Sequence, residues 1–181
     1  MPAGWTAVET STGVSRETLQ ARVLSGSSSM KIYRSAVGNT QMRVIDAMDV
    51  YPGQNLDASA WVQTSGLAQG SGGGGFQVRI AYYDSYGNYT GYAASSVFTT
   101  PSSTVWRKVG MQAKAPDGTA YARMYVGQYN CSGTVWVDGA RFGDGTMKLT
   151  DADGTVRTLR QVGDGTYQRD PLAGTLALKR T

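Results

Sequence analysis

The sequence has 181 residues, a formal net charge of +4 and a hydrophobic share of 40%, with 24 glycines and only 17% charged residues. This length fits one domain plus an extension, and the glycine-rich, weakly charged composition is typical of a turn-rich β protein. The positive charges do not gather in one segment and no window approaches the ~18 apolar residues of a membrane span, so we expect neither a nucleic-acid partner nor a membrane partner.

Short apolar or alternating segments between turn signals predict an all-β fold. In chain order the predicted strands cover Trp5–Glu9, Leu19–Leu24, Met30–Arg34, Met42–Val50, Leu56–Gln63, Phe76–Tyr83, Ser95–Thr99, Val105–Gln112, Ala120–Gly127 and Thr134–Phe142. Turns rich in Gly, Pro, Asn and Asp separate these strands, among them the glycine-rich loop at 71–75. The regular spacing predicts a two-sheet antiparallel β-sandwich.

The sandwich pattern ends at about Gly145. Beyond it, Met147–Thr150 and Thr155–Val162 flank an Asp-rich turn in the manner of a hairpin, and an apolar segment at Leu172–Leu178 follows. This stretch is too short to bury a core of its own. We predict a sandwich domain at 1–145 and a C-terminal arm at 146–181 that serves attachment.

The side chains available for catalysis are few. The sequence has no histidine, which excludes the commonest general base, the usual serine triad and most zinc sites. Cys131 is the only cysteine, so no intrachain disulfide can form. Most aspartates stand beside Gly, Pro or strand ends, where they serve turns. We predict that the chain is not an enzyme and needs no cofactor, with a glycosidase using two carboxylates as an alternative.

Aromatic residues suggest a binding function. The sequence has 11 Tyr and 4 Trp but only 3 Phe, and five tyrosines lie between positions 82 and 92. Tyr and Trp combine an apolar body with a polar tip, which suits the C–H faces and hydroxyl edges of a sugar ring. Tyr86, Asn88, Tyr89 and Tyr92 are therefore candidate carbohydrate-binding residues on a loop.

Side-chain alternation adds candidates on sheet faces. Trp61 shares its face with polar neighbours, and on the segment after Phe76 the side chains of Gln77, Arg79, Ala81 and Tyr83 share the outer face. Further candidates for carbohydrate binding are Trp61, Tyr83, Tyr121, Arg123 and Tyr125. The alternative reading is packing, because Tyr and Arg are also typical of interfaces between subunits.

Several short motifs together resemble a known family. They are Gly4-Trp5, Gly26-Ser27-Ser28-Ser29-Met30-Lys31, Tyr51-Pro52-Gly53, Ala60-Trp61-Val62, Trp106-Arg107-Lys108-Val109 and Val137-Asp138-Gly139. Over residues 5 to 142 the chain resembles the jelly-roll carbohydrate-binding modules that accompany bacterial glycoside hydrolases and also occur in phage virion proteins. The resemblance implies a jelly-roll topology for the sandwich.

The same resemblance bears on metal binding. In that family a calcium ion commonly joins the first and last strands, with an aspartate at the position of Asp138 and a glutamate from an N-terminal segment. The N-terminal segment has no counterpart here, so Asp138 is either a calcium ligand or an ordinary turn residue.

From these features we expect a non-enzymatic structural or decorating component of a phage particle, on its tail or capsid. Its expected partners are other virion subunits, in a homo-oligomer, and a cell-surface polysaccharide. The N-terminus shows no export signal, which fits a virion protein made in the host cytoplasm. The alternative is an extracellular carbohydrate-binding module of a secreted polysaccharide-degrading enzyme.

Overall fold

The computed structural model describes residues 4–8 and 13–144 in full, together with the backbone of four strands between Thr146 and Lys179. Its nine strands before residue 145 are β1 (Trp5–Val8), β2 (Val14–Glu17), β3 (Ser29–Val44), β4 (Met48–Asp49), β5 (Asn55–Gln69), β6 (Gly75–Tyr83), β7 (Tyr89–Ala94), β8 (Ser103–Lys114) and β9 (Tyr121–Gly143). One 3-10 turn, η1, covers Gln20–Arg22. Among the described residues, no helix is long and apolar enough to cross a membrane.

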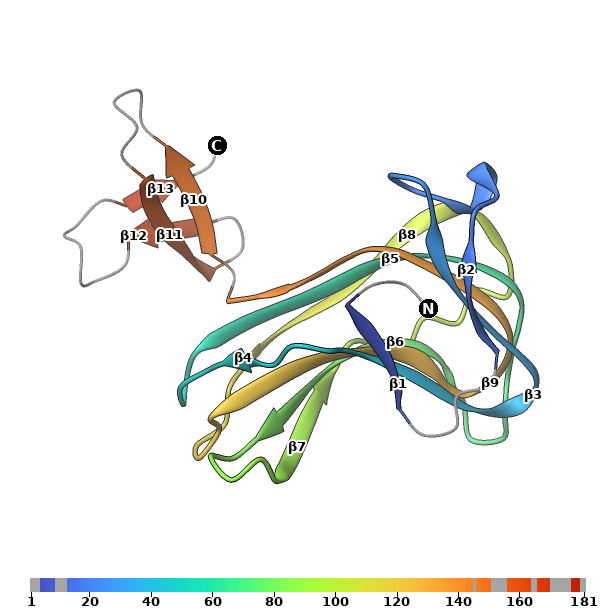
Figure 1. Ribbon diagram of the computed structural model, residues 1–181, viewed down its shortest axis with the longest axis horizontal. Coiled ribbons are helices and arrows are strands. Elements are labelled where there is room, and N and C mark those ends of the chain that lie inside the picture. The colour runs from blue at the N-terminus through green and yellow to red at the C-terminus, as the bar shows by residue number, and fades with distance from the viewer. Residues whose placement is uncertain are drawn as a thin grey trace.

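The nine strands form two layers (Figure 1). Sheet one has the order β2-β3-β9-β5-β8 and uses the first half of β3 and the second half of β9. Sheet two has the order β1-β3-β9-β6-β7 and uses the other halves of the same two strands. The short strand β4 pairs with the first two residues of β9. All these pairs are antiparallel, so the predicted all-β sandwich is confirmed.

The core lies between the two sheets. Along β6, Phe76, Val78 and Ile80 have no exposed surface, while the residues between them point outward. The predicted alternation on the other strands is also confirmed: the fully buried side chains include Leu56, Ala58, Ala60 and Val62 on β5 and Ala122, Met124 and Val126 on β9. Burial of this apolar surface is the main force that holds the sheets face to face.

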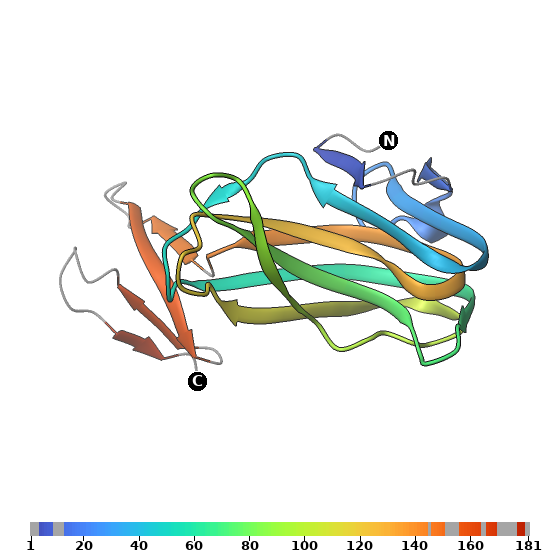
Figure 2. The same ribbon diagram turned by 90° about the horizontal axis from the view of Figure 1, so that it is seen from below.

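The long strands β3 and β9 each pass from one sheet to the other, and both bend at the same end of the sandwich (Figure 2). On β9 the bend contains Asn130, with φ +47°, and Gly133, with φ +105°. The Asn130 amide donates to the carbonyl oxygens of Ser71, at 2.8 Å, and Gly73, and its backbone N–H donates to Asn39 Oδ1 at 2.8 Å. Asn130 therefore joins the bend of β9 to two neighbouring segments, including the predicted glycine-rich loop.

Two predicted strands are wrong. Leu19–Leu24 contains η1 instead, because the Glu17 carboxylate accepts the N–H groups of Thr18 and Leu19, both at 3.0 Å, and turns the chain. Ser95–Thr99 is not a strand: the strand in this part of the chain is β7, which ends at Ala94. Within 95–99 only an isolated bridge between Phe98 and Phe76 is present. The predicted strands Ala120–Gly127 and Thr134–Phe142 are merged into β9. Met30–Arg34 and the first three residues of Met42–Val50 are merged into β3, whereas the rest of Met42–Val50 lies mostly in a bend and in β4.

The C-terminal strands form a separate four-stranded antiparallel sheet. They are β10 (Thr146–Thr150), β11 (Val156–Gly163), β12 (Thr166–Arg169) and β13 (Ala177–Lys179), in that order. The pairing of β10 with β11 confirms the predicted hairpin. Most of the predicted apolar segment at 172–178 lies outside the described residues, and the domain boundary at 145/146 stays a prediction.

Candidate functional site

The outer surface of sheet two gathers most of the candidate residues. In the strand register Tyr83 stands opposite Tyr121, Ala81 opposite Arg123, and Arg79 opposite Tyr125. On the other side of β9, Arg43 of β3 also stands opposite Tyr125. We call this surface the aromatic face, and its members are Arg43, Arg79, Tyr83, Tyr89, Tyr92, Tyr121, Arg123, Tyr125 and Tyr129.

Arg79 lies between two tyrosine rings. The central guanidinium carbon is 3.3 Å from the centroid of the Tyr129 ring and 4.6 Å from that of Tyr92. Its Nε and Nη2 atoms donate to Gln77 Oε1 at 3.2 and 2.8 Å. These contacts are cation–π interactions with a hydrogen-bonded cation, so they fix the rings of β7 and β9 relative to β6.

A pair of phenols occupies the middle of the face. The hydroxyls of Tyr83 and Tyr125 lie 2.6 Å apart and form a hydrogen bond. Burial, with a further contribution from the Tyr125 hydrogen bond, raises the pKa of Tyr83 to about 12. The hydrogen bond with Tyr125 raises the pKa of the neighbouring Arg43 guanidinium above its ordinary value. At neutral pH the Tyr83 hydroxyl is therefore uncharged, while Arg43 keeps its positive charge.

The face has a covered floor and an open rim. Tyr125 and Tyr129 are only 9% and 8% exposed, whereas Tyr89 and Tyr92 on the edge strand β7 are 58% and 53% exposed. The Tyr89 ring stands edge-on to Tyr83, with centroids 6.0 Å apart and an interplanar angle of 69°. The Tyr89 ring is thus held by Tyr83 and the Tyr92 ring by Arg79, and both remain open to solvent.

The tyrosine-rich turn before β7 is ordered by Asp84. Its carboxylate accepts the backbone N–H groups of Tyr86 and Asn88, at 2.9 and 2.8 Å, and the Asn88 side-chain amide at 3.0 Å. These bonds lower the pKa of Asp84, the Asn88 side chain contributing most. Asn88 therefore supports the turn, and Tyr86, at 89% exposure, stands at its tip.

Trp61 lies on the opposite sheet. It belongs to β5 in sheet one, where it stands opposite Lys108 and Asp138 and is 36% exposed. A shallow cavity of about 380 Å³ lies on the same strands, beside Lys108, and is lined by Asp57, Ser59, Lys108, Gly110, Met111 and Gln112. The structure therefore separates Trp61 from the other candidates.

Asp138 is engaged by backbone groups. Its Oδ2 accepts the N–H groups of Leu24 and Ser25, at 2.8 and 3.1 Å, and Oδ1 accepts that of Gly139 at 2.7 Å. In the described ranges, no group of three or more His, Cys, Asp or Glu residues is placed to hold a metal. Asp138 thus fixes the loop before β3, and its role as a calcium ligand stays a prediction.

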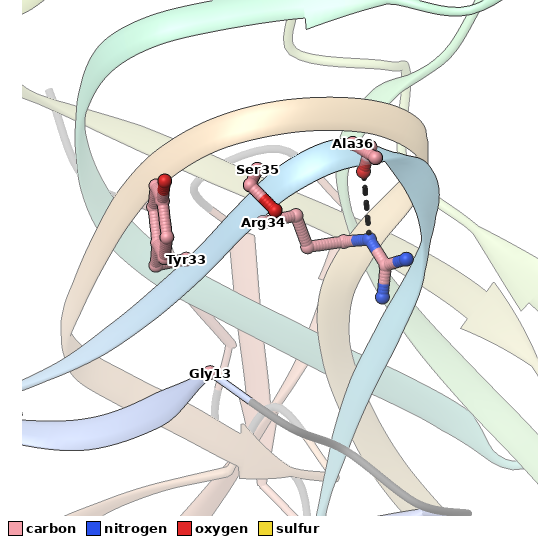
Figure 3. A pocket seen from close by; sticks show the side chains of 5 residues that line it. All are labelled: Gly13, Tyr33, Arg34, Ser35 and Ala36. Carbon is pink, nitrogen blue, oxygen red and sulfur yellow. Dashed lines mark hydrogen bonds between the residues drawn. The ribbon is translucent and has the colours of Figure 1, made fainter.

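A second cavity, of about 270 Å³, lies beside the bend of β3 and is lined by Gly13, Tyr33, Arg34, Ser35 and Ala36 (Figure 3). The guanidinium of Arg34 is hydrogen-bonded to the bend of β3. It donates from Nε to the Ala36 carbonyl at 3.2 Å and from Nη1 to the Asn39 carbonyl at 2.7 Å. We therefore assign this arginine to the fold.

Four residues were not candidates from sequence: Arg43, Arg79 and Tyr129 of the aromatic face, and Gln77, which accepts the hydrogen bonds of Arg79. For Gln77 and Arg79 the signal was present, because both share the outward alternation of Tyr83. Tyr129 continues the alternation of Tyr121 and Tyr125, but the predicted strand ended at Gly127, two residues too early. Arg43 could be found only from the pairing of β3 with β9.

The fold has counterparts among solved structures. No family model matches the sequence, and no curated protein matches it either. Solved structures do match. A xylan-binding domain of carbohydrate-binding family 22 aligns with a TM-score of 0.59 and 18% identity, over 80% of this chain and 90% of that one. The chain has the jelly-roll fold of carbohydrate-binding modules.

Two further structures share this module-like fold. The C-terminal family 22 module of the Clostridium thermocellum xylanase Xyn10B aligns with a TM-score of 0.58 and 17% identity, over 78% of this chain and 86% of that one. The enzymatically active domain of tailspike protein 4 from bacteriophage CBA120 aligns with a TM-score of 0.57 and 16% identity, over 78% of this chain. The chain spans only 19% of that tailspike domain. At these identities the TM-scores show a shared fold alone.

Proposed function

We propose that this chain binds polysaccharide through the aromatic face and does not cleave it. The observation that supports the proposal best is the arrangement of three rings: Tyr89 stands edge-on to Tyr83, Tyr92 lies against the fixed cation of Arg79, and Tyr89 and Tyr92 form a half-exposed rim. Tyrosine rings offer flat apolar surfaces to the C–H faces of a sugar, and phenols and guanidinium groups offer hydrogen bonds to its hydroxyls.

The chemistry of the face supports binding without cleavage. Glycoside hydrolysis needs two carboxyl groups about 5–10 Å apart, and the aromatic face as defined contains tyrosines and arginines alone. The carboxylate on the adjoining turn, Asp84, is held by backbone and side-chain donors of that turn. The absence of histidine from the sequence points the same way.

We further infer a place for the chain on a phage particle, as a subunit of its tail or capsid, with residues 146–181 as the attachment segment. The fold shared with a bacteriophage tailspike domain supports this role. The alternative is a module of a polysaccharide-degrading enzyme, which is supported by the family 22 modules whose full length this chain nearly covers. Both roles use the same binding face.

The test is co-sedimentation of the full chain with insoluble xylan and with bacterial cell-wall polysaccharide. We expect binding to at least one polysaccharide, and a loss of about fivefold or more in the variant Tyr89→Ala/Tyr92→Ala, because each ring contributes about 0.5–1.5 kcal/mol beyond its buried area. The matched control is Trp61→Ala, an aromatic truncation on the opposite sheet. Equal losses in both variants would contradict the assignment of the site to sheet two.

A further inference from the structure

The aromatic face holds three positive charges that have neutral partners. Arg79 contacts Gln77 and two tyrosine rings. Arg123 donates from Nη1 to the backbone carbonyls of Val44, at 3.4 Å, and Ile45. Arg43 contacts the phenols described above. Within the part of the chain that the structure describes, none of the three guanidinium groups forms an ion pair with a carboxylate.

Arg43 has a further unmet requirement. Its Nε is buried and has no hydrogen-bond partner. The Arg43 side chain as a whole is half-buried, and a buried N–H left without a hydrogen-bond partner costs free energy, because protein groups replace the water that would bind it. A protein that keeps such a group on an otherwise ordered surface gains when an anion arrives to pair with it.

The strand register places the three arginines around Tyr125. Arg43 and Arg79 stand on either side of Tyr125, on the two strands that neighbour β9. Neighbouring strands lie about 4.8 Å apart, so the two backbone positions are separated by roughly 10 Å. Arg123 lies two residues before Tyr125 on the same face of β9, at roughly 7 Å along the strand. The three cations thus surround an area about as large as one sugar residue.

The acidic groups near this area lie outside it. Asp49 stands opposite Tyr121 at the start of β9 and is exposed, Asp46 lies in the exposed bend after Ile45, and Asp84 belongs to the turn before β7. The face as a whole is positively charged, in keeping with the net charge of +4.

We propose that the ligand of the aromatic face is an anionic polysaccharide, whose acidic group lies over Tyr125 between Arg43 and Arg79 while its sugar rings contact Tyr89 and Tyr92. This inference rests on the proposed function and names its ligand class. Guanidinium groups bind carboxylate and phosphate oxygens alike, in short charge-assisted pairs. The acidic group is therefore either the carboxylate of a uronic acid or the phosphate of a cell-wall polymer.

The experiment measures binding of the full chain to matched soluble probes by calorimetry. The probes are a galacturonic acid hexamer, the same hexamer as its neutral methyl ester, a glycerol-phosphate wall polymer bearing sugars, and polyglutamate. We expect one of the two acidic sugar polymers to bind at least tenfold more tightly than the neutral ester, and its Kd to rise with salt because the attraction is ionic. Polyglutamate, which has the charge without sugar rings, should bind more weakly.

The variants Arg43→Gln and Arg79→Gln test whether the acidic group lies between these two arginines. The matched control is Lys108→Gln, which removes one positive charge from sheet one. Each arginine variant should bring the Kd of the acidic probe to that of the ester, and Arg43→Lys should retain part of the preference. Near-ultraviolet circular dichroism reports whether each variant keeps its fold, and a misfolded Arg43→Gln leaves Arg79→Gln as the deciding variant.

The outcomes separate the two proposals. If the ester, or neutral xylan, binds as tightly as both acidic probes, the inference of an anionic ligand is overturned and the proposed function stands. Binding of an acidic probe that survives both arginine variants, or that polyglutamate matches, also overturns the inference. If the probes fail to bind and the insoluble polysaccharides do not retain the chain, the proposed function itself fails.

Discussion

Single residues set the chemistry of the aromatic face. Tyr83 is a candidate from sequence that the structure places at the centre of the face, where a second phenol and a guanidinium surround it. Its hydroxyl is a donor and an acceptor only while it keeps its proton. The raised pKa therefore extends the range in which the Tyr83 hydroxyl can donate to about pH 12.

The raised pKa predicts a loss of stability in alkali. An unfolded tyrosine titrates near pH 10, and Tyr83 in the folded chain titrates at about 12. Between pH 10 and pH 12 the unfolded chain has lost the Tyr83 proton, whereas the folded chain retains it. The free energy of unfolding that Tyr83 contributes below pH 10 therefore falls as the pH rises. Urea unfolding at pH 9, 10, 11 and 12 should show a smaller decline in Tyr83→Phe than in the natural sequence. The control is Tyr86→Phe, whose ring lies in solvent, and an undiminished decline in Tyr83→Phe would contradict the prediction.

Sequence alone could identify part of this chemistry. Alternation placed Tyr121, Arg123 and Tyr125 on one face, and the pairing of β6 with β9 brings that face beside Tyr83. Trp61 has the same kind of pattern but lies on the other sheet, because alternation distinguishes the two faces of a strand and does not say to which sheet the strand belongs. Asn88 looked like a ligand-binding amide, and its bonds to Asp84 are contacts that only the folded turn defines.

Among the elements, the bend of β9 sets the position of the site. At Gly133 the backbone has φ +105°, and a Cβ there would lie 2.3 Å from the Gly66 carbonyl oxygen. Glycine is therefore required for two reasons, conformation and close approach. The bend lets one strand supply Tyr121 to Tyr129 to sheet two and then continue in sheet one.

Gly133→Ala should destabilise the sandwich strongly. The strain of a left-handed residue costs about 1–2 kcal/mol and overpacking about 1–3 kcal/mol, so we expect a total of about 2–5 kcal/mol. The matched control is Gly118→Ala, also at positive φ but with no heavy atom within 4 Å of the added Cβ, which should cost about 1–2 kcal/mol. Denaturant unfolding measures both, and equal losses would show that the contact with Gly66 does not matter.

The predicted elements were most accurate where one face is buried. β5 and β6 alternate between core and surface, and their predicted positions are close to the observed ones. β7 is an edge strand in which every residue is exposed or half-buried, so it has no apolar alternation, and its tyrosines suggested a loop. The segment at η1 has apolar residues, yet Leu19 is 61% exposed and the chain turns at Glu17, a side-chain effect that hydrophobic patterning does not register.

At the scale of the whole molecule, the sandwich and the C-terminal strands form separate sheets. β9 reaches Gly143 within the sandwich, and β10 to β13 pair among themselves. The sandwich has its own core, formed by residues from Met30 to Val137. It therefore contains the apolar contacts that an independent fold requires.

Deleting residues 146–181 should leave the sandwich folded. We expect the shortened chain to unfold cooperatively and to retain polysaccharide binding, because the core and the aromatic face both precede residue 146. If the segment serves attachment, sedimentation velocity should show oligomers of the full chain and monomers of the shortened one. A shortened chain that does not fold would show that the C-terminal sheet belongs to the same domain.

The passage of β3 and β9 through both sheets has a mechanical consequence. In a sandwich whose sheets meet only through side chains, a force on one sheet can slide it over the other. Here two continuous backbones, paired with each other in both sheets, would have to break hydrogen bonds together before such sliding could begin. A ligand that pulls on sheet two therefore also pulls on the backbones of β3 and β9, which continue into sheet one. The tension of an anchored polymer is thus shared by both sheets.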